Sequence, residues 1–115
     1  MWRDDAYLLD ILIAAQKVQK FTEGVTWDNF RESDLIQNAV MRSLEVIGEA
    51  ARCVSDETKD EHPEIPWREL VGLRNRLIHE YFRIDVAKVW DAVQNDLPSL
   101  ISAVEPLVPP QEEES

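Results

Sequence analysis

Apolar residues recur at the spacing of helices along most of the chain. Between about Asp4 and Phe21 they follow the i, i+3, i+4, i+7 pattern of one helical face, and Gly24 marks a stop after this helix. A second helix is predicted from Ser33, whose hydroxyl suits an N-cap, to about Ser55. The apolar positions are Leu8, Ile11, Leu12, Ala15 and Val18, then Leu35, Ile36, Ala39, Val40, Leu44, Ile47, Ala51 and Val54. Each segment predicts a long helix that buries one face.

Two further helices are predicted in the second half of the chain. The third begins at Trp67, after Pro66, and runs to about Tyr81. The fourth follows the N-cap candidate Asp85 and keeps its period through Pro98, which removes a backbone hydrogen bond and predicts a kink. The candidate core positions are Trp67, Leu70, Val71, Ile78 and Tyr81, then Val86, Val89, Trp90, Val93, Leu97, Leu100, Ile101 and Val104. Four helices with short connections predict an all-α, up-and-down four-helix bundle.

Two connections between these helices differ in character. Residues 26–32 are polar but include Trp27 and Phe30, so we expect a loop held against the body of the protein. Residues 56–66 are charged and contain two prolines, which predicts an exposed connection between two helical hairpins.

Composition narrows the class of protein further. The 115 residues suit one domain, which we place at residues 1–105, followed by a flexible acidic tail at residues 106–115. No stretch approaches the roughly 18 apolar residues of a membrane span, and the N-terminus lacks a signal-peptide core, so we expect a cytoplasmic protein. The single cysteine, Cys53, excludes an internal disulfide and a thiolate metal cluster, and we interpret it as a packing residue.

The charge of the chain restricts what it binds. There are 23 acidic residues against 12 basic ones, which gives a net charge of −11. This charge opposes non-specific binding to nucleic acid or to an anionic membrane. A nucleic-acid site must therefore be a local exception to the acidity.

The segment from Gly72 to Arg83 is such an exception. It contains three of the twelve cations, Arg74, Arg76 and Arg83, with a histidine, an amide and a tyrosine. On a helix Asn75 and His79 lie within about 40° of each other, so Asn75 can orient the imidazole. Arg76 and Arg83 flank the same face of the helix. Arg74 lies about 140° from His79 on a regular helix. The two meet only if the helix end distorts or if a second copy of the chain contributes.

At this point the sequence resembles a known family. Arg74-x-x-x-x-His79-x-Tyr81 resembles the Arg-x4-6-His signature of the HEPN superfamily, and in particular the HepT toxins, which are encoded beside the minimal nucleotidyltransferase MntA. The resemblance extends to the Gly48-Glu49-Ala50-Ala51 step, where the glycine suits a close helix contact, and to Asp96-Leu97-Pro98. It implies a HEPN-like homodimer that acts as a metal-independent ribonuclease without a cofactor, with its site at the cleft between protomers. It also implies that this ribonuclease is the toxin of a type VII-like toxin–antitoxin module.

The resemblance also assigns roles to residues. Arg74 and His79 match the catalytic pair of the family, and Asn75 matches the polar position after the arginine. Tyr81 matches the tyrosine that the partner nucleotidyltransferase modifies with AMP. We expect Arg76 to support the catalytic pair, and Arg76 and Arg83 to contact RNA. The expected partners are a second copy of the chain, an MntA-like nucleotidyltransferase antitoxin and an RNA substrate, without a membrane.

The chemistry of metal-free RNA cleavage agrees with these roles. The reaction needs a base for the 2′-hydroxyl, an acid for the leaving 5′-oxygen, and cations for the charge that develops on phosphorus. One protomer supplies a single suitable histidine, His79, whereas a two-fold dimer supplies two histidines and two Arg74 guanidiniums. A single histidine with water also meets the requirement.

Other interpretations stay open at this point. The chain could be a non-catalytic partner that presents a nucleotide or substrate to a nucleotidyltransferase, or a structural dimerisation module. His79 could be a helix C-terminal histidine that interacts with the last carbonyls, and Tyr81 a core residue with its hydroxyl at the surface. We interpret His62 and the acidic run from Asp56 to Glu69 as solvated surface rather than a metal site.

Overall fold

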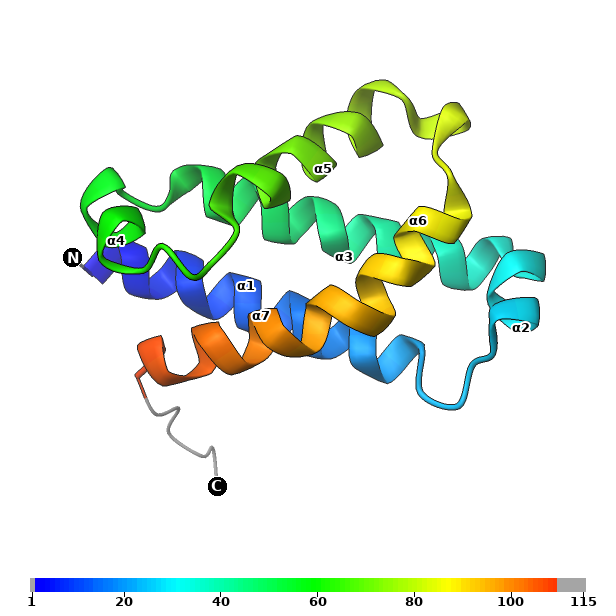
Figure 1. Ribbon diagram of the computed structural model, residues 1–115, viewed down its shortest axis with the longest axis horizontal. Helices are drawn as coiled ribbons and strands as arrows, with labels where there is room; N and C mark the ends of the chain where they lie inside the picture. The colour runs from blue at the N-terminus through cyan, green and yellow to red at the C-terminus, as the bar shows by residue number, and fades with distance from the viewer. Residues whose placement is uncertain (1, 110–115) are drawn as a thin grey trace.

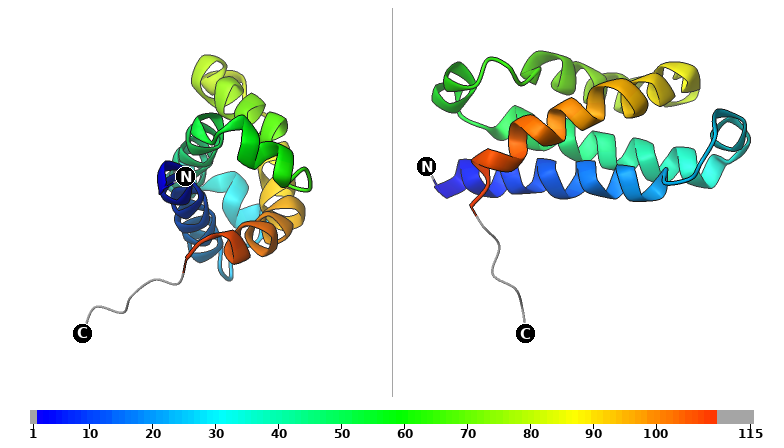
Figure 2. Two further views of the ribbon diagram at one scale, coloured as in Figure 1. Left: turned by 90° about the vertical axis from the view of Figure 1, so that its left-hand side faces the viewer. Right: turned by 60° about the horizontal axis from the view of Figure 1, so that its bottom comes forward.

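Four long helical segments run alternately up and down the molecule (Figure 1). The computed structural model describes residues 2–109. Its α-helices are α1 (Trp2–Phe21), α2 (Trp27–Glu32), α3 (Asp34–Cys53), α4 (Asp56–Glu61), α5 (Trp67–His79), α6 (Val86–Asp91) and α7 (Leu97–Val104). The helix α3 packs against both α1 and α5, and α7 returns across α1 (Figure 2). The predicted all-α bundle is confirmed, and the described residues contain no strand.

Local signals fix the ends of these helices as predicted. The Ser33 hydroxyl accepts a hydrogen bond from the backbone N–H of Ile36 at 3.1 Å and caps α3. The Asp85 carboxylate accepts one from the N–H of Ala87 at 3.0 Å and caps α6. Gly24, after α1, has a φ of 71°, a conformation that costs glycine little.

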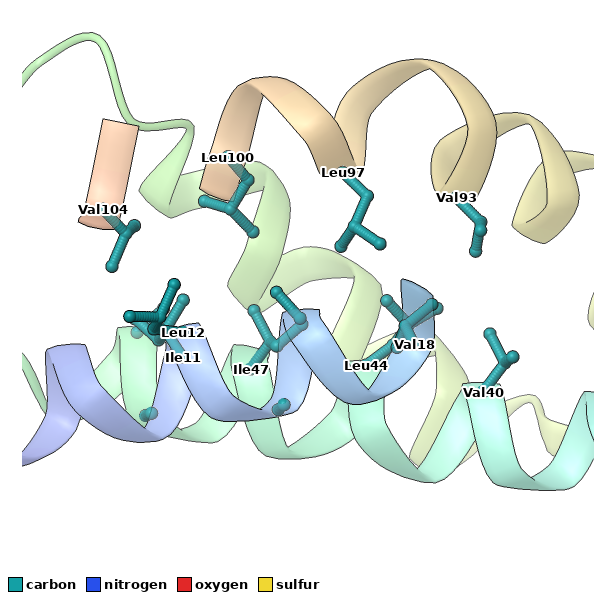
Figure 3. Close-up of a cluster of buried hydrophobic side chains, with 14 of the residues drawn as sticks. Ile11, Leu12, Val18, Val40, Leu44, Ile47, Val93, Leu97, Leu100 and Val104 are labelled. Carbon is teal, nitrogen blue, oxygen red and sulfur yellow. The ribbon is translucent and has the colours of Figure 1, made fainter. Parts of the chain in front are cut away.

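Apolar side chains from α1, α3 and the returning fourth segment meet in one core (Figure 3). Fully buried members of the core are Ile11, Ala15, Val18, Phe30, Val40, Ala51, Leu77 and Val104. In the fourth segment Val93, Leu97, Leu100 and Val104 point toward α1 and α3, so the predicted helical period does continue past Pro98. The segment accommodates the proline through a π-helical turn, Ala92–Asp96, which directly precedes α7.

Both connections expected to be irregular contain short helices. Thr26 caps α2, which buries Phe30 completely, so the aromatic anchor was predicted but the helix was not. Ser55 caps α4, and Ile65 in the following turn is 2% exposed, so this connection is less open than predicted. A capping hydroxyl stabilises even a single polar turn that carries no apolar period. The half-buried His62 lies here and pairs with Glu64 at 3.5 Å.

The third long helix ends two residues earlier than predicted. It ends at His79, and Tyr81–Arg83 form a separate 3-10 turn, η1. Because the core face of α5 is centred on Leu77, the predicted core residues Ile78 and Tyr81 are instead 44% and 40% exposed. This correction leaves two large side chains at the surface beside His79.

The C-terminal part of the described chain packs loosely on the body. A 3-10 turn, η3 (Glu105–Leu107), follows α7, and Leu107 and Val108 are half-buried against the core. Most of the predicted acidic tail, residues 110–115, lies outside the described residues, so its flexibility stays a prediction. Within residues 2–109 no helix combines the length and the apolarity that a bilayer crossing needs.

Candidate functional site

The predicted catalytic pair lies on α5, which stays helical as far as His79. On such a helix Arg74 and His79 point about 140° apart. The guanidinium of Arg74 lies against α3, whereas His79 is exposed at the helix end. A single chain therefore does not bring the two residues together, and no distortion of the helix end does so.

A glycine sets the distance between α3 and α5 at Arg74. A Cβ atom added at Gly48 would lie 2.2 Å from the Cβ of Arg74 and 2.6 Å from the carbonyl oxygen of Leu70. Both distances are far below van der Waals contact, so only glycine allows this approach. The expected close helix contact is confirmed, and it brings the backbone of Arg74 directly onto α3.

Two polar side chains hold the Arg74 guanidinium. Its Nη2 forms an ion pair with Oε2 of Glu49 at 3.1 Å, and its Nη1 donates a hydrogen bond to Oδ1 of Asn75 at 2.9 Å. Its Nε is buried and has no hydrogen-bond partner among the described residues. The side chain as a whole is 26% exposed, so Arg74 is only partly buried.

Glu49 forms ion pairs with two arginines, Arg74 and Arg52. Its Oε1 accepts a hydrogen bond from Nη2 of Arg52 at 2.6 Å. The hydrogen bond from Arg52, together with the positive charges of Arg52 and Arg74, holds the pKa of Glu49 below its ordinary value. Glu49 therefore stays a carboxylate at neutral and mildly acidic pH.

The amide of Asn75 is not placed as predicted. It accepts its hydrogen bond from Arg74 and not from His79. Within residues 2–109 the His79 imidazole has no hydrogen-bond partner, although Asn75 is one helical turn away. The charged guanidinium is the stronger donor for the amide oxygen. The prediction that Asn75 orients the imidazole is therefore wrong for the single chain, and Asn75 supports Arg74 instead.

The Tyr81 hydroxyl reaches back to α3. It donates a hydrogen bond to Oδ1 of Asn38, a contact that nothing in the sequence pattern indicated. The Tyr81 ring meets the ring of Phe82 edge-on at a centroid distance of 5.3 Å, and Phe82 is 98% exposed. The phenol of Tyr81 is thus fixed against α3 at the surface of the protein.

Arg76 and Arg83 lie on the other side of α5. They line a groove of about 830 Å³ between α5 and the α6–α7 segment, where Lys88 is a third cation. Arg76 lies one turn before His79 on α5, so it still flanks the face of His79. The prediction that Arg83 flanks the same helical face is wrong, because residue 83 follows the helix in η1. Acidic groups at the groove are Glu64, Glu69, Glu80, Asp85, Asp91 and Asp96. The groove is therefore not a uniformly positive surface.

The structure adds Glu49 and Asn38 to the predicted site residues. Glu49 stands next to Gly48, so the close helix contact was the signal that could have pointed to it. Cys53 is half-buried, and its thiol faces the Glu49 carboxylate at 3.9 Å, in keeping with a packing residue. Within the described part of the chain, no three His, Cys, Asp or Glu side chains gather as a metal would require.

Residues 11–107 match the family model described as Ribonuclease HepT-like. The chain belongs to the HepT-like family. The matched region spans α1 to η3 and contains every site residue named above. The family resemblance predicted from the Arg74-to-Tyr81 segment is thereby confirmed.

Relatives of this HepT-like chain cover nearly its whole length. It is 43% identical over 100 residues to "Putative RNase MJ1380" of Methanocaldococcus jannaschii, which spans 87% of this chain and 92% of that protein. It is also 43% identical over 101 residues to "Probable ribonuclease HepT" of Thermococcus cleftensis, which spans 88% of this chain and 92% of that protein. No solved structure matches the chain significantly.

Proposed function

We propose that this HepT-like protein is a metal-independent endoribonuclease that cleaves RNA with Arg74 and His79 at a cleft between two copies of the chain. The observation that carries the proposal is the Arg74-x4-His79 pair on an accessible helix end of a chain in the Ribonuclease HepT-like family. In the cell it acts in the cytoplasm as the toxin of a toxin–antitoxin module.

Each residue has a defined task in this reaction. The His79 imidazole removes the proton of the 2′-hydroxyl, whose oxygen attacks phosphorus, and a water molecule gives a proton to the leaving 5′-oxygen and is reprotonated by the imidazolium. The guanidinium of Arg74 binds the phosphate oxygens and stabilises the charge that develops on them. The products are a 2′,3′-cyclic phosphate and a free 5′-hydroxyl.

A second copy of the chain completes this set of groups. Arg74 and His79 diverge by about 140° on α5, so a phosphate held by one Arg74 is out of line with the His79 of the same chain. A two-fold axis near the end of α5 pairs the Arg74 of each copy with the His79 of its partner. The exposed side chains Ile78 and Phe82 give this end of α5 an apolar surface suited to the contact.

The experiment that tests the proposal is RNA cleavage by matched histidine variants. We expect His79→Ala and Arg74→Ala to lose at least about 100-fold in cleavage rate, since each removes a group that acts in the transition state. His62→Ala, which alters the other histidine in the chain, should cleave normally. An RNA with a 2′-deoxy residue at the cleavage site should stay intact, and its cleavage would contradict the mechanism. In cells, expression of the wild type should arrest growth and His79→Ala should relieve the arrest. If the wild type cleaves no RNA and causes no growth arrest, the protein is a non-catalytic partner of a nucleotidyltransferase instead.

The pairing across two copies has its own test. Arg74→Ala and His79→Ala are mixed and allowed to exchange protomers. Half of the resulting dimers then hold one intact Arg74–His79 pair, so about a quarter of the wild-type activity should return. A mixture that stays inactive although light scattering finds dimers would contradict a site shared in this way.

Regulation of the toxin is assigned to Tyr81. We expect an MntA-like nucleotidyltransferase to transfer AMP from ATP to the Tyr81 hydroxyl, with release of pyrophosphate. Tyr81 is 40% exposed and lies two residues after His79. A bulky anion there blocks the approach of an RNA phosphate to His79. Mass spectrometry after incubation with the neighbouring gene product and ATP should find AMP on the Tyr81 peptide. The peptide of Tyr7, the other tyrosine, is the internal control, and an unmodified Tyr81 would count against this assignment.

A further inference from the structure

The ion pair between Glu49 and Arg74 joins α3 to the predicted catalytic residue. Glu49 lies near the C-terminal end of α3, one residue after the glycine at which the two helices approach closely. Its Oε2 lies 3.1 Å from Nη2 of Arg74. The contact therefore links this close point of helix packing to the orientation of one guanidinium.

The hydrogens of the guanidinium are only partly used. Of its five N–H groups, one contacts Glu49 and one is donated to Asn75, while the Nε–H is buried. One N–H group on each Nη atom is left for another acceptor. The edge of the guanidinium between its two Nη atoms, here called the outer edge, is one that binds a phosphate through two oxygens.

Glu49 anchors the guanidinium without cancelling its charge. One carboxylate lies between two guanidiniums, those of Arg52 and Arg74, so one net positive charge remains in the trio. The shorter contact of Glu49, at 2.6 Å, goes to Arg52 and leaves a single contact for Arg74. A competitor for the phosphate would instead take both outer N–H groups of Arg74.

We infer that Glu49 is a positioning residue for RNA cleavage, which holds Arg74 so that the outer edge of its guanidinium faces the phosphate of the substrate. The inference rests on the proposed function. Asn75 steadies the same guanidinium from within α5, and Gly48 provides the helix approach that lets Glu49 reach it. The chemistry itself stays with Arg74 and His79.

Steady-state cleavage of a short single-stranded RNA tests this inference. Glu49→Ala should lower kcat by about 10- to 100-fold with less than about a threefold change in KM, since a misdirected guanidinium fails mainly in the transition state. Glu49→Gln should recover most of the loss, because its amide oxygen still accepts from Arg74. Glu45→Ala is the matched control: Glu45 lies one turn earlier on α3 and pairs with Arg42 at 3.3 Å. It should cleave within about twofold of the wild type.

A double variant separates positioning from general support of the fold. In an Arg74→Ala background Glu49→Ala should lower cleavage no further, because its effect passes through Arg74. A further loss in this background would mean that Glu49 acts on the fold or on another group, and would overturn the inference. A rise in activity in Glu49→Ala would identify it as a competitor of the phosphate, which overturns the inference equally.

A readout without catalysis distinguishes this inference from the proposed function. Hydrogen exchange of the buried Arg74 Nε–H, followed by NMR of the whole protein, should be at least about 10-fold faster in Glu49→Ala and unchanged in Glu45→Ala. Faster exchange with no cleavage by the wild type would mean that the ion pair orients Arg74 but that the proposed reaction is wrong. Unchanged exchange in Glu49→Ala would overturn the positioning role.

Discussion

The two sides of α5 are built in opposite ways. On one side α5 meets α3 so closely that no side chain fits at Gly48. On the other side a groove of about 830 Å³ lies between α5 and the α6–α7 segment. We call these the closed side and the open side of α5. Arg74 lies on the closed side, whereas Arg76 and Arg83 lie on the open side.

This difference explains how one helix offers cations of two kinds. A guanidinium on the closed side is fixed by packing and by the Glu49 carboxylate, which suits the single geometry that the proposed reaction requires of Arg74. Cations on the open side have solvent beside them and keep their conformational freedom, and acidic groups lie among them. Under the proposed function, the closed side is thus suited to catalysis, and a role of the open side in RNA binding is a matter for experiment.

The largest expected effect compares a leucine from each side. Leu77 is fully buried toward α3, while Leu73 is half-buried at the groove. Leu77→Ala should destabilise the protein by about 3 kcal/mol, because it leaves a cavity in a packed interior. Leu73→Ala should cost about 1 kcal/mol, since solvent already reaches its site. Urea unfolding of both variants checks the prediction, and equal losses would mean that the groove is as well packed as the core.

The second prediction compares two glycines. A methyl group at Gly48 collides with Arg74 and Leu70, so Gly48→Ala should destabilise the protein by about 2 kcal/mol. Gly72, also on α5, has nothing within 4 Å of an added Cβ, so Gly72→Ala should stabilise it by up to about 1 kcal/mol through helix propensity. Thermal unfolding should thus shift in opposite directions for the two variants. Stabilisation by Gly48→Ala would contradict the close contact at Gly48, and destabilisation by Gly72→Ala would contradict the open space at Gly72.

The sequence was sufficient for the long helices because their signals are local. The period of Leu8 to Val18 and the caps at Ser33 and Asp85 depend on neighbouring residues alone, and all of them are found in the structure. The short helices were missed because a single capped turn carries no period. Their N-cap residues, Thr26 and Ser55, are the local signals that indicate these two helices.

Only those site residues that belong to one continuous sequence motif could be predicted. Arg74, His79 and Tyr81 follow from one spaced motif. Glu49 and Asn38, in contrast, depend on the register of α3 against α5, which is set by packing at Gly48. The local sequence did not indicate the end of α5 either. Glu80 leaves the helix although its helix propensity is ordinary.

A third prediction concerns the segment that leads into α5. Asp4, buried on α1, accepts hydrogen bonds from the hydroxyls of Ser55 and Thr58, both at 2.6 Å, and thereby ties the start of α4 to α1. The hydrogen bonds from Ser55 and Thr58 lower the pKa of Asp4. Asp4→Asn should therefore cost about 1.5 kcal/mol at pH 7.

The cost of Asp4→Asn should depend on pH in one direction. Because the folded pKa lies below the unfolded value of about 3.9, the stabilisation is complete above that value and is lost as the pH falls through the folded pKa. Urea unfolding of the wild type and the variant at pH 7, 5 and 3 should give the same difference at the first two and a smaller one at the last. A difference that grows on acidification would contradict the lowered pKa.

The smallest expected effect on stability is at the open side itself. Arg76→Ala should change the free energy of unfolding by less than about 0.5 kcal/mol, because the side chain is exposed at the groove. Its effect should appear in RNA binding, where the loss of one phosphate contact lowers the slope of log affinity against log salt by about 0.7 for a single strand. Lys17→Ala, an exposed cation on α1, should leave this slope unchanged. If both variants give the wild-type slope, RNA does not follow the open side, and the acidic groups along the groove outweigh its three cations.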